Sequence, residues 1–106
     1  AGAIPADLVE ALVRTLRTDR NPGVRRKAAQ ALAGLPPTRE ICDAFLAALR
    51  TDRNPAVRGI AVEALGRAAR DLDGPSIEGL RDRAADVRES EHLRVKAANT
   101  LRTISL

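Results

Sequence analysis

The chain has 106 residues, enough for one domain that buries about 65% of the surface its unfolded chain exposes. Its net charge of +4 comes almost entirely from arginine, with 16 Arg against 2 Lys. A single Cys excludes an internal disulfide and leaves the compartment open, the lack of Trp and Tyr argues against stacking on nucleic-acid bases, and no apolar run reaches the ~18 residues of a membrane span.

The first predicted helix runs from about Pro5 to Thr18. Leu8, Leu12 and Leu16 recur every four residues, so they form an apolar stripe along one side of this helix. Proline suits the first helical position because the N–H it lacks would have no partner there. The stripe has to be buried against a neighbouring element.

A seven-residue phrase comes next and occurs twice, as 16–22 and again, residue for residue, as 49–55. In the first copy Asn21 is placed to cap a second helix from Pro22 to about Ala33, where Gly34 supplies a stop. A repeat of about this period indicates units that stack, because neither helix of a unit can bury its apolar side alone.

The second unit repeats the order of the first. Thr38 is predicted to cap the third helix, which carries Phe45, the sequence's one aromatic residue. Asn54 is predicted to cap the fourth helix, which is expected to run from Pro55 to as far as Arg70. Both units therefore read as helix, short turn, helix.

The third unit is altered. Residues 71–74 form the next predicted loop, and Pro75 opens the fifth helix. Ser90 is expected to cap the sixth helix, with Glu91 where the earlier units have proline. Leu93 aligns with Val57 at an offset of 36, so this unit has a longer turn. Terminal units of a stack are expected to be atypical because one side faces water.

We therefore expect an all-α solenoid of three stacked helical hairpins, six helices in a single domain over residues 1–106. The hairpins are expected at about 4–36, 37–70 and 74–106. Because the chain begins Ala-Gly-Ala rather than with Met, we expect it to be a segment of a larger protein.

The pattern Leu-x-x-Asp-x-x-Pro-x-Val-Arg-x-x-Ala-x-x-Ala-Leu is complete at 16–32 and 49–65, and its second half recurs at 93–101. It resembles HEAT repeats, in particular the short bacterial type, over essentially the whole chain. The resemblance implies a right-handed stack that acts as a protein–protein interaction module. Short arrays of this kind also occur as tail domains of larger bacterial regulators.

In HEAT proteins the turn aspartate and the arginine that follows it form a ladder between neighbouring units. The resemblance assigns this structural role to Asp19, Arg25, Asp52 and Arg58. In the third unit Arg88 stands at the aligned aspartate position, which puts that rung in doubt, and Asp86 could substitute after a shift. Charged pairs with such spacing are more often structural than catalytic.

The exposed side of the second helices is the first candidate binding surface. With Val24, Ala28 and Leu35 taken as the buried direction, the opposite side is rich in small residues. We name it the second-helix strip: Arg26, Ala29, Gln30, Ala33, Gly59, Val62, Glu63, Gly66, Val95, Ala98, Asn99 and Arg102. In a HEAT-like stack this side is concave, and an apolar strip with a polar rim suits a docked helix or extended segment. The alternative is that an alanine-rich chain simply exposes many alanines.

The arginines of the turns are the second candidate. The turns inside the hairpins share one edge of a solenoid, so their arginines should form a stripe, the basic edge: Arg17, Arg20, Arg50, Arg53 and Arg88. Such a stripe could follow a nucleic-acid backbone or an acidic protein partner. Because Asp19 and Asp52 partly neutralise it, nucleic-acid binding is the alternative and not the first hypothesis.

No pattern of catalytic or metal-binding residues is visible. His92 stands alone in a turn, and Cys42 lies among apolar residues, without a second His or Cys to complete a metal site or a nucleophile–base pair. We therefore expect no enzyme activity, no cofactor and no metal. The expected partner is a protein or another part of the parent chain, with self-association through the C-terminal helix as a further alternative.

Overall fold

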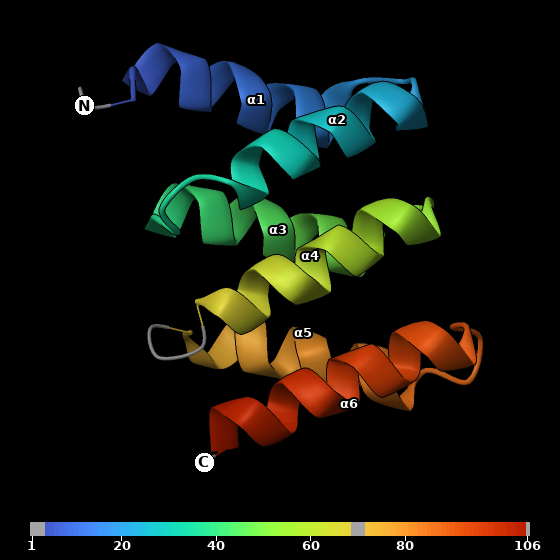
Figure 1. The fold of residues 1–106 in the computed structure, drawn as a ribbon. Helices are drawn as coiled ribbons and strands as arrows, with labels where there is room; N and C mark the ends of the chain where they lie inside the picture. Colours follow the sequence, from blue (N-terminus) through green and yellow to red (C-terminus); the bar gives the residue numbers. More distant parts are fainter. Residues whose placement is uncertain (1–3, 69–71, 106) are drawn as a thin grey trace.

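The computed structural model describes residues 4–68 and 72–105, and this part of the chain is helical with short connections (Figure 1). The helices are α1 (Ala6–Thr18), α2 (Pro22–Ala33), α3 (Arg39–Thr51), α4 (Pro55–Arg67), α5 (Gly74–Ala85) and α6 (Glu91–Ser105). No strand occurs among the described residues. The prediction of an all-α solenoid of helical hairpins is confirmed.

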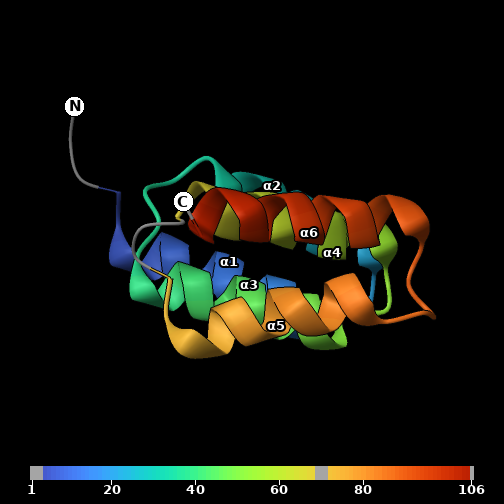
Figure 2. The same cartoon turned by 90° about the horizontal axis from the view of Figure 1, so that it is seen from below.

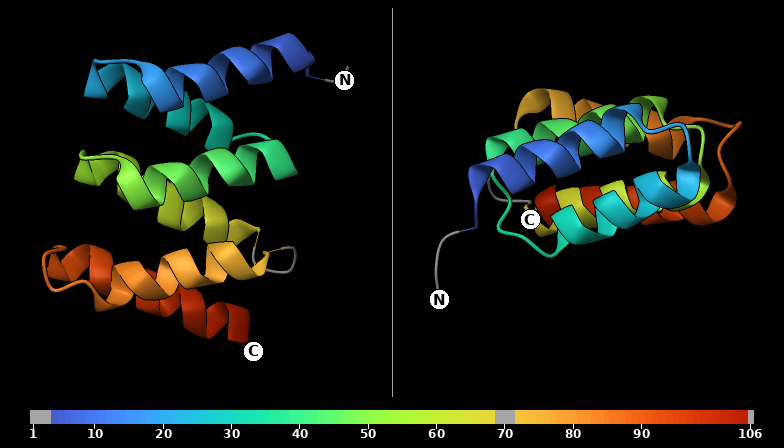
Figure 3. Two further views of the ribbon diagram at one scale, coloured as in Figure 1. Left: turned by 180° about the vertical axis from the view of Figure 1, so that it is seen from behind. Right: turned by 90° about the horizontal axis from the view of Figure 1, so that it is seen from above.

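The helices form two layers. α1, α3 and α5 lie side by side in one layer, and α2, α4 and α6 lie in the other, as perpendicular views show (Figure 2, Figure 3). Each hairpin is a consecutive pair, α1 with α2, α3 with α4 and α5 with α6, and neighbouring helices within a layer also pack together. A middle helix therefore has a packing neighbour on both sides within its layer, whereas an end helix has one.

Side-chain caps start the helices as the sequence predicts. Asn21 Oδ1 and Asn54 Oδ1 each accept a hydrogen bond from the backbone N–H two residues on, at 2.8 and 2.9 Å. Thr38 and Ser90 accept from the N–H three residues on, at 3.3 and 3.2 Å. These bonds satisfy N–H groups that have no partner inside the helix, a contribution of about 1 kcal/mol each.

Two helix starts and one helix end differ from expectation. Pro5 occupies the N-cap position of α1, so the helix begins one residue later than predicted. α5 begins one residue before Pro75, because Asp73 caps it and accepts from the N–H three residues on at 2.9 Å. α4 ends at Arg67, with Ala68 as its C-cap. The expected helix end at Arg70 and the first residue of the predicted loop, Asp71, lie outside the described residues.

The core lies between the two layers and centres on the middle hairpin. Phe45, Leu49 and Leu65 are each at most 1% exposed. Leu16 and Leu32 join the same apolar cluster from the first hairpin. Truncating a buried aromatic such as Phe45 to alanine costs about 3–5 kcal/mol, so this cluster dominates the stability of the stack.

Candidate functional site

A bidentate ion pair joins the first hairpin to the second at the edge that carries the turns. Arg25 in α2 donates from Nε to Asp52 Oδ2 at 2.9 Å and from Nη2 to Oδ1 at 3.1 Å. Its Nη1 donates to the backbone carbonyl of Asp19 at 2.9 Å. The hydrogen bonds to Asp52 raise the pKa of the Arg25 guanidinium. The rung therefore runs from the arginine of one hairpin to the aspartate of the next.

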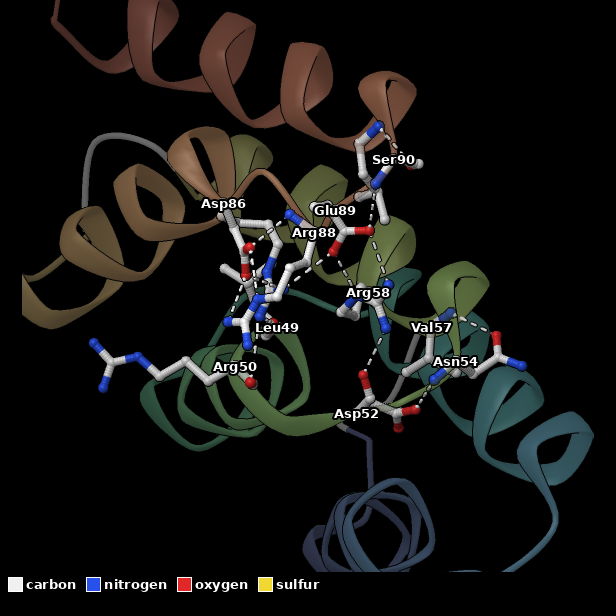
Figure 4. A network of polar contacts seen from close by, with 12 residues as sticks. Leu49, Arg50, Asp52, Asn54, Val57, Arg58, Asp86, Arg88, Glu89 and Ser90 are labelled. Carbon is white, nitrogen blue, oxygen red and sulfur yellow. Dashed lines mark hydrogen bonds and ion pairs between the residues drawn. The ribbon is translucent and has the colours of Figure 1, made fainter.

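The second rung joins the middle hairpin to the last with a different acid (Figure 4). Arg58 donates from Nε to Glu89 Oε2 at 2.8 Å and from Nη2 to Oε1 at 2.9 Å. Arg83 of α5 adds a bond from Nη1 to Oε2 at 3.1 Å. Glu89 is 6% exposed, yet its pKa is lowered, because the bonds from Arg58 outweigh the opposing effect of burial.

The sequence alignment did not identify Glu89 as the acid of this rung. Arg88, at the aligned position, is exposed. Asp86, the proposed substitute, instead accepts from the Arg88 N–H at 2.9 Å and pairs with its guanidinium at 3.1 Å, and this pairing lowers the pKa of Asp86. The longer turn carries Glu89 opposite Arg58, and its position directly before the cap Ser90 was the available clue.

Asp19 belongs to a turn and to no rung. Its Oδ1 accepts from Asn21 N at 2.8 Å, and within the described residues its carboxylate forms no ion pair. Asp52 accepts the equivalent turn bond from Asn54 N at 2.9 Å in addition to its rung. The two copies of the phrase therefore differ: Asp19 makes only the turn hydrogen bond, whereas Asp52 makes the turn hydrogen bond and the ion pair with Arg25.

Two of the five arginines of the basic edge are bonded to other parts of the chain. Arg50 donates to the backbone carbonyl of Pro75 at 3.1 Å, and Arg88 pairs with Asp86. Arg17, Arg20 and Arg53 are exposed and form no side-chain ion pair within the described part of the chain. The edge therefore offers three unpaired guanidinium groups to a partner.

Two members of the second-helix strip are buried and are excluded from any contact with a partner. Ala29 and Val62 are each 0% exposed. Neighbouring second helices cover them, because α4 packs on α2 and α6 packs on α4. The expectation that these two residues are exposed was wrong, because it considered one buried side per helix and ignored packing within the layer. Ala98, at the equivalent position of the last helix, is half-buried.

The other ten members of the strip reach the surface to different extents. The exposed members are Arg26, Gln30, Glu63, Val95, Asn99 and Arg102. The half-buried members are Ala33, Gly59, Gly66 and Ala98. The exposed positions are therefore mainly polar, with Val95 as the large apolar exception at 49% exposure.

A groove runs between α4 and α6 on this face. Two clefts of about 330 and 590 Å³ share Glu63, His92 and Lys96, so they are parts of one depression, which we call the α4–α6 groove. The strip residues that line it are Gly59, Glu63, Gly66, Val95 and Asn99. The structure thus gathers members of the strip from the second and third hairpins and leaves those of the first outside.

Two glycines shape this groove. A Cβ at Gly66 would lie 3.1 Å from Thr100 Cγ2, so the missing side chain lets α4 and α6 approach closely. A Cβ at Gly59 would meet no atom within 4 Å, so the space in front of it is open. With Val95 nearby, the groove combines a small, partly apolar floor with open room for another chain.

An ion pair crosses the groove. Lys96 Nζ donates to Glu63 Oε1 at 2.6 Å, and this bond lowers the pKa of Glu63. Glu63 is exposed, and so is His92, which lines the same groove. An exposed pair of this kind contributes about 0–1 kcal/mol, so an arriving partner can displace it at small cost.

The described residues offer few other candidates for a functional site. No group of three or more His, Cys, Asp or Glu side chains in 4–68 and 72–105 is placed to hold a metal ion. Cys42 packs half-buried against the core. None of the helices described is long and apolar enough to cross a membrane.

Comparison with known families gives one finding. The sequence model described as HEAT repeats matches residues 9–101, which include α2 to α5 in full. No curated protein and no solved structure matches the chain. The match covers both rungs and most of the α4–α6 groove.

Proposed function

The chain belongs to the HEAT-repeat family, whose members commonly serve as non-catalytic scaffolds for protein interactions, and we propose that it binds a partner helix or extended segment in the α4–α6 groove. The carrying observation is the open floor at Gly59, where no atom lies within 4 Å of a Cβ position. A neighbouring backbone can approach closely there, as a docked helix or strand requires.

The charges around the groove favour an acidic partner. Arg67 and Lys96 line it on the positive side, against Glu63 on the negative side. Val95, which lines the same part of the groove, supplies an exposed apolar anchor. Displacing the Lys96–Glu63 pair would free the ammonium for a partner carboxylate. A segment with one apolar residue flanked by Asp or Glu fits this arrangement.

Selection of displayed peptides against the immobilised chain tests the proposal. Selected peptides should shift the backbone amide resonances of the groove, and Gly59→Glu or Val95→Glu should weaken their binding at least about tenfold, because each adds a charged side chain to the floor. Both sites are open enough to leave helicity unchanged. Ala31→Glu, on the exposed side of α2, is the control with the same added charge.

Two results would move the binding surface elsewhere. Peptide binding that survives both Gly59→Glu and Val95→Glu rules out the groove. Binding of a labelled random DNA duplex that is tight at about 50 mM salt, weakens steeply at about 200 mM and vanishes in Arg20→Glu/Arg53→Glu assigns function to the basic edge.

A further inference from the structure

Arg83 fills the space between the second and third hairpins at the turn edge. Its Nη2 donates to the backbone carbonyls of Leu49 at 2.8 Å and Arg50 at 3.3 Å, at the C-terminal end of α3. Its Nη1 donates to Glu89 Oε2 at 3.1 Å. A guanidinium group thus joins the free carbonyls of one helix end to the acid of the rung.

The equivalent position between the first and second hairpins carries no such side chain. Arg83 lies ten residues after its cap, Asp73, and the residue ten after the cap Thr38 is Ala48. Beside Ala48 lies a cleft of about 390 Å³. We call it the first-interface cleft, and its lining includes Leu16, Arg17, Asp19, Arg25, Asp52 and Arg53.

The acceptors that Arg83 uses have counterparts in this cleft. Leu16 and Arg17 precede Leu49 and Arg50 by one repeat, and within the described residues no donor reaches their carbonyl oxygens. Both Asp52 and Glu89 bond a backbone N–H and an arginine Nη2 through one oxygen.

The second oxygens of these acids differ. Glu89 Oε2 accepts from Arg58 Nε and from Arg83, whereas Asp52 Oδ2 accepts, among residues 4–68 and 72–105, from Arg25 Nε alone. One acceptor position on Asp52 is therefore open, and it lies in the lining of the first-interface cleft. A carboxylate oxygen has two lone pairs, so a second donor is accommodated.

We propose that the first-interface cleft binds the guanidinium group of an arginine from outside the chain, in the arrangement that Arg83 shows at the next interface. The lining holds three arginines against two aspartates, so the added cation has to bring a carboxylate of its own. Arg17 and Arg53, exposed and unpaired at the rim, are placed to receive it. The ligand class is therefore an arginine with an adjacent carboxylate. This site lies at the turn edge and does not depend on the α4–α6 groove.

NMR titration of the full chain with L-arginine tests the proposal, with L-lysine and arginine amide as controls at equal ionic strength. L-Arginine should give saturable amide shifts around Leu16, Ala48 and Asp52, with half-saturation of the order of 1 mM. Lysine should bind at least about tenfold more weakly because an ammonium group cannot bridge the acceptors as a planar fork does. Arginine amide, without the carboxylate, should also bind more weakly. Equal shifts with all three ligands would overturn the proposal.

Two variants test whether the absence of an internal arginine side chain is what opens the first interface to a ligand. Ala48→Arg supplies the missing side chain, so it should abolish arginine binding, whereas Ala31→Arg adds the same charge on an exposed helix side and should leave binding intact. Arg83→Ala opens the second interface and should add arginine-dependent shifts around Leu49 and Glu89. Binding that persists in Ala48→Arg, or an Arg83→Ala variant that gains no site, contradicts the assignment.

A peptide pair identifies the source of the guanidinium. A blocked Gly-Arg-Glu-Gly peptide that binds more tightly than L-arginine, while its Lys counterpart does not bind, points to an arginine on a partner protein. L-Arginine binding at least as tightly as the peptide points to a small molecule. Failure of both arginine ligands overturns the proposal and leaves the proposed function of the groove untouched.

Discussion

Between the first and second hairpins Arg25 pairs with Asp52, and between the second and third Arg58 pairs with Glu89. Both arginines bind with Nε and Nη2, and each sends Nη1 to the carbonyl of its own turn aspartate, at 2.9 and 2.8 Å. The acids differ in type and in position along the turn. The geometry of the rung is therefore kept although the sequence that supplies its acid changes.

In the longer turn of the third unit, two acidic residues make the interactions that a single aspartate makes in the second unit. Asp52 holds its own turn through Asn54 N and also receives Arg25. In the third unit Asp86 holds the turn while Glu89 receives the arginine. Glu89 still accepts from the neighbouring Ser90 N, and its second oxygen accepts from Arg83 as well as from Arg58.

The largest effect is expected for Glu89→Ala, which removes the buried carboxylate that pairs with the half-buried guanidinium groups of Arg58 and Arg83. Arg58 then has no acid within the described residues, whereas Arg83 keeps Asp86 at 3.6 Å. Removing one partner of a buried pair costs about 3–5 kcal/mol. Urea unfolding followed by circular dichroism measures it, with the exposed Glu91→Ala as control. A loss below about 1 kcal/mol would show that the second rung does not hold the third hairpin.

The two identical phrases provide a matched pair for the next effect. Asp52→Ala removes a turn bond and a rung, whereas Asp19→Ala removes a turn bond alone. We expect losses of about 3 and about 1 kcal/mol in the free energy of unfolding. Equal losses in the two variants would mean that the rung at Asp52 contributes nothing measurable.

Acid should weaken the second interface in a defined direction. The folded pKa of Glu89 lies below its ordinary value of 4.5, so its contribution is complete above about pH 4.5 and is lost as the pH falls through the folded pKa. Urea unfolding at stepped pH should show a steeper acid loss for the native chain than for Glu89→Gln, which does not titrate. Parallel pH profiles would contradict this.

The smallest effect is expected in the α4–α6 groove. Lys96→Ala removes an exposed ion pair with Glu63 and should change the free energy of unfolding by less than about 1 kcal/mol. The same urea measurement checks it. A loss of 2 kcal/mol or more would show that the pair is structural, which would argue against its displacement by a partner.

Local signals were sufficient to predict the fold. Asn21 and Asn54 cap helices through their own backbone neighbours, and the repeated phrase identifies the hairpins. Burial and ion pairs that involve a neighbouring hairpin were harder to predict. Val62 is covered by a helix of the next unit, and Glu89 meets Arg58 through a change in turn length that alignment alone does not place in space. Five residues that line the α4–α6 groove belong to the predicted second-helix strip: Gly59, Glu63, Gly66, Val95 and Asn99. The sequence did not predict the charged lining residues Arg67, His92 and Lys96, or the confinement of the groove to the last two hairpins.

A double-mutant cycle on Arg58 and Glu89, run beside one on Arg25 and Asp52, tests most directly the claim that two unlike turns form equivalent rungs. Each cycle uses the two single alanine variants and the double variant, with free energies of unfolding from urea titration. The structure predicts favourable coupling of about 1–3 kcal/mol in both cycles. Coupling within about 0.3 kcal/mol of zero at Arg58–Glu89, with clear coupling at Arg25–Asp52, would contradict it.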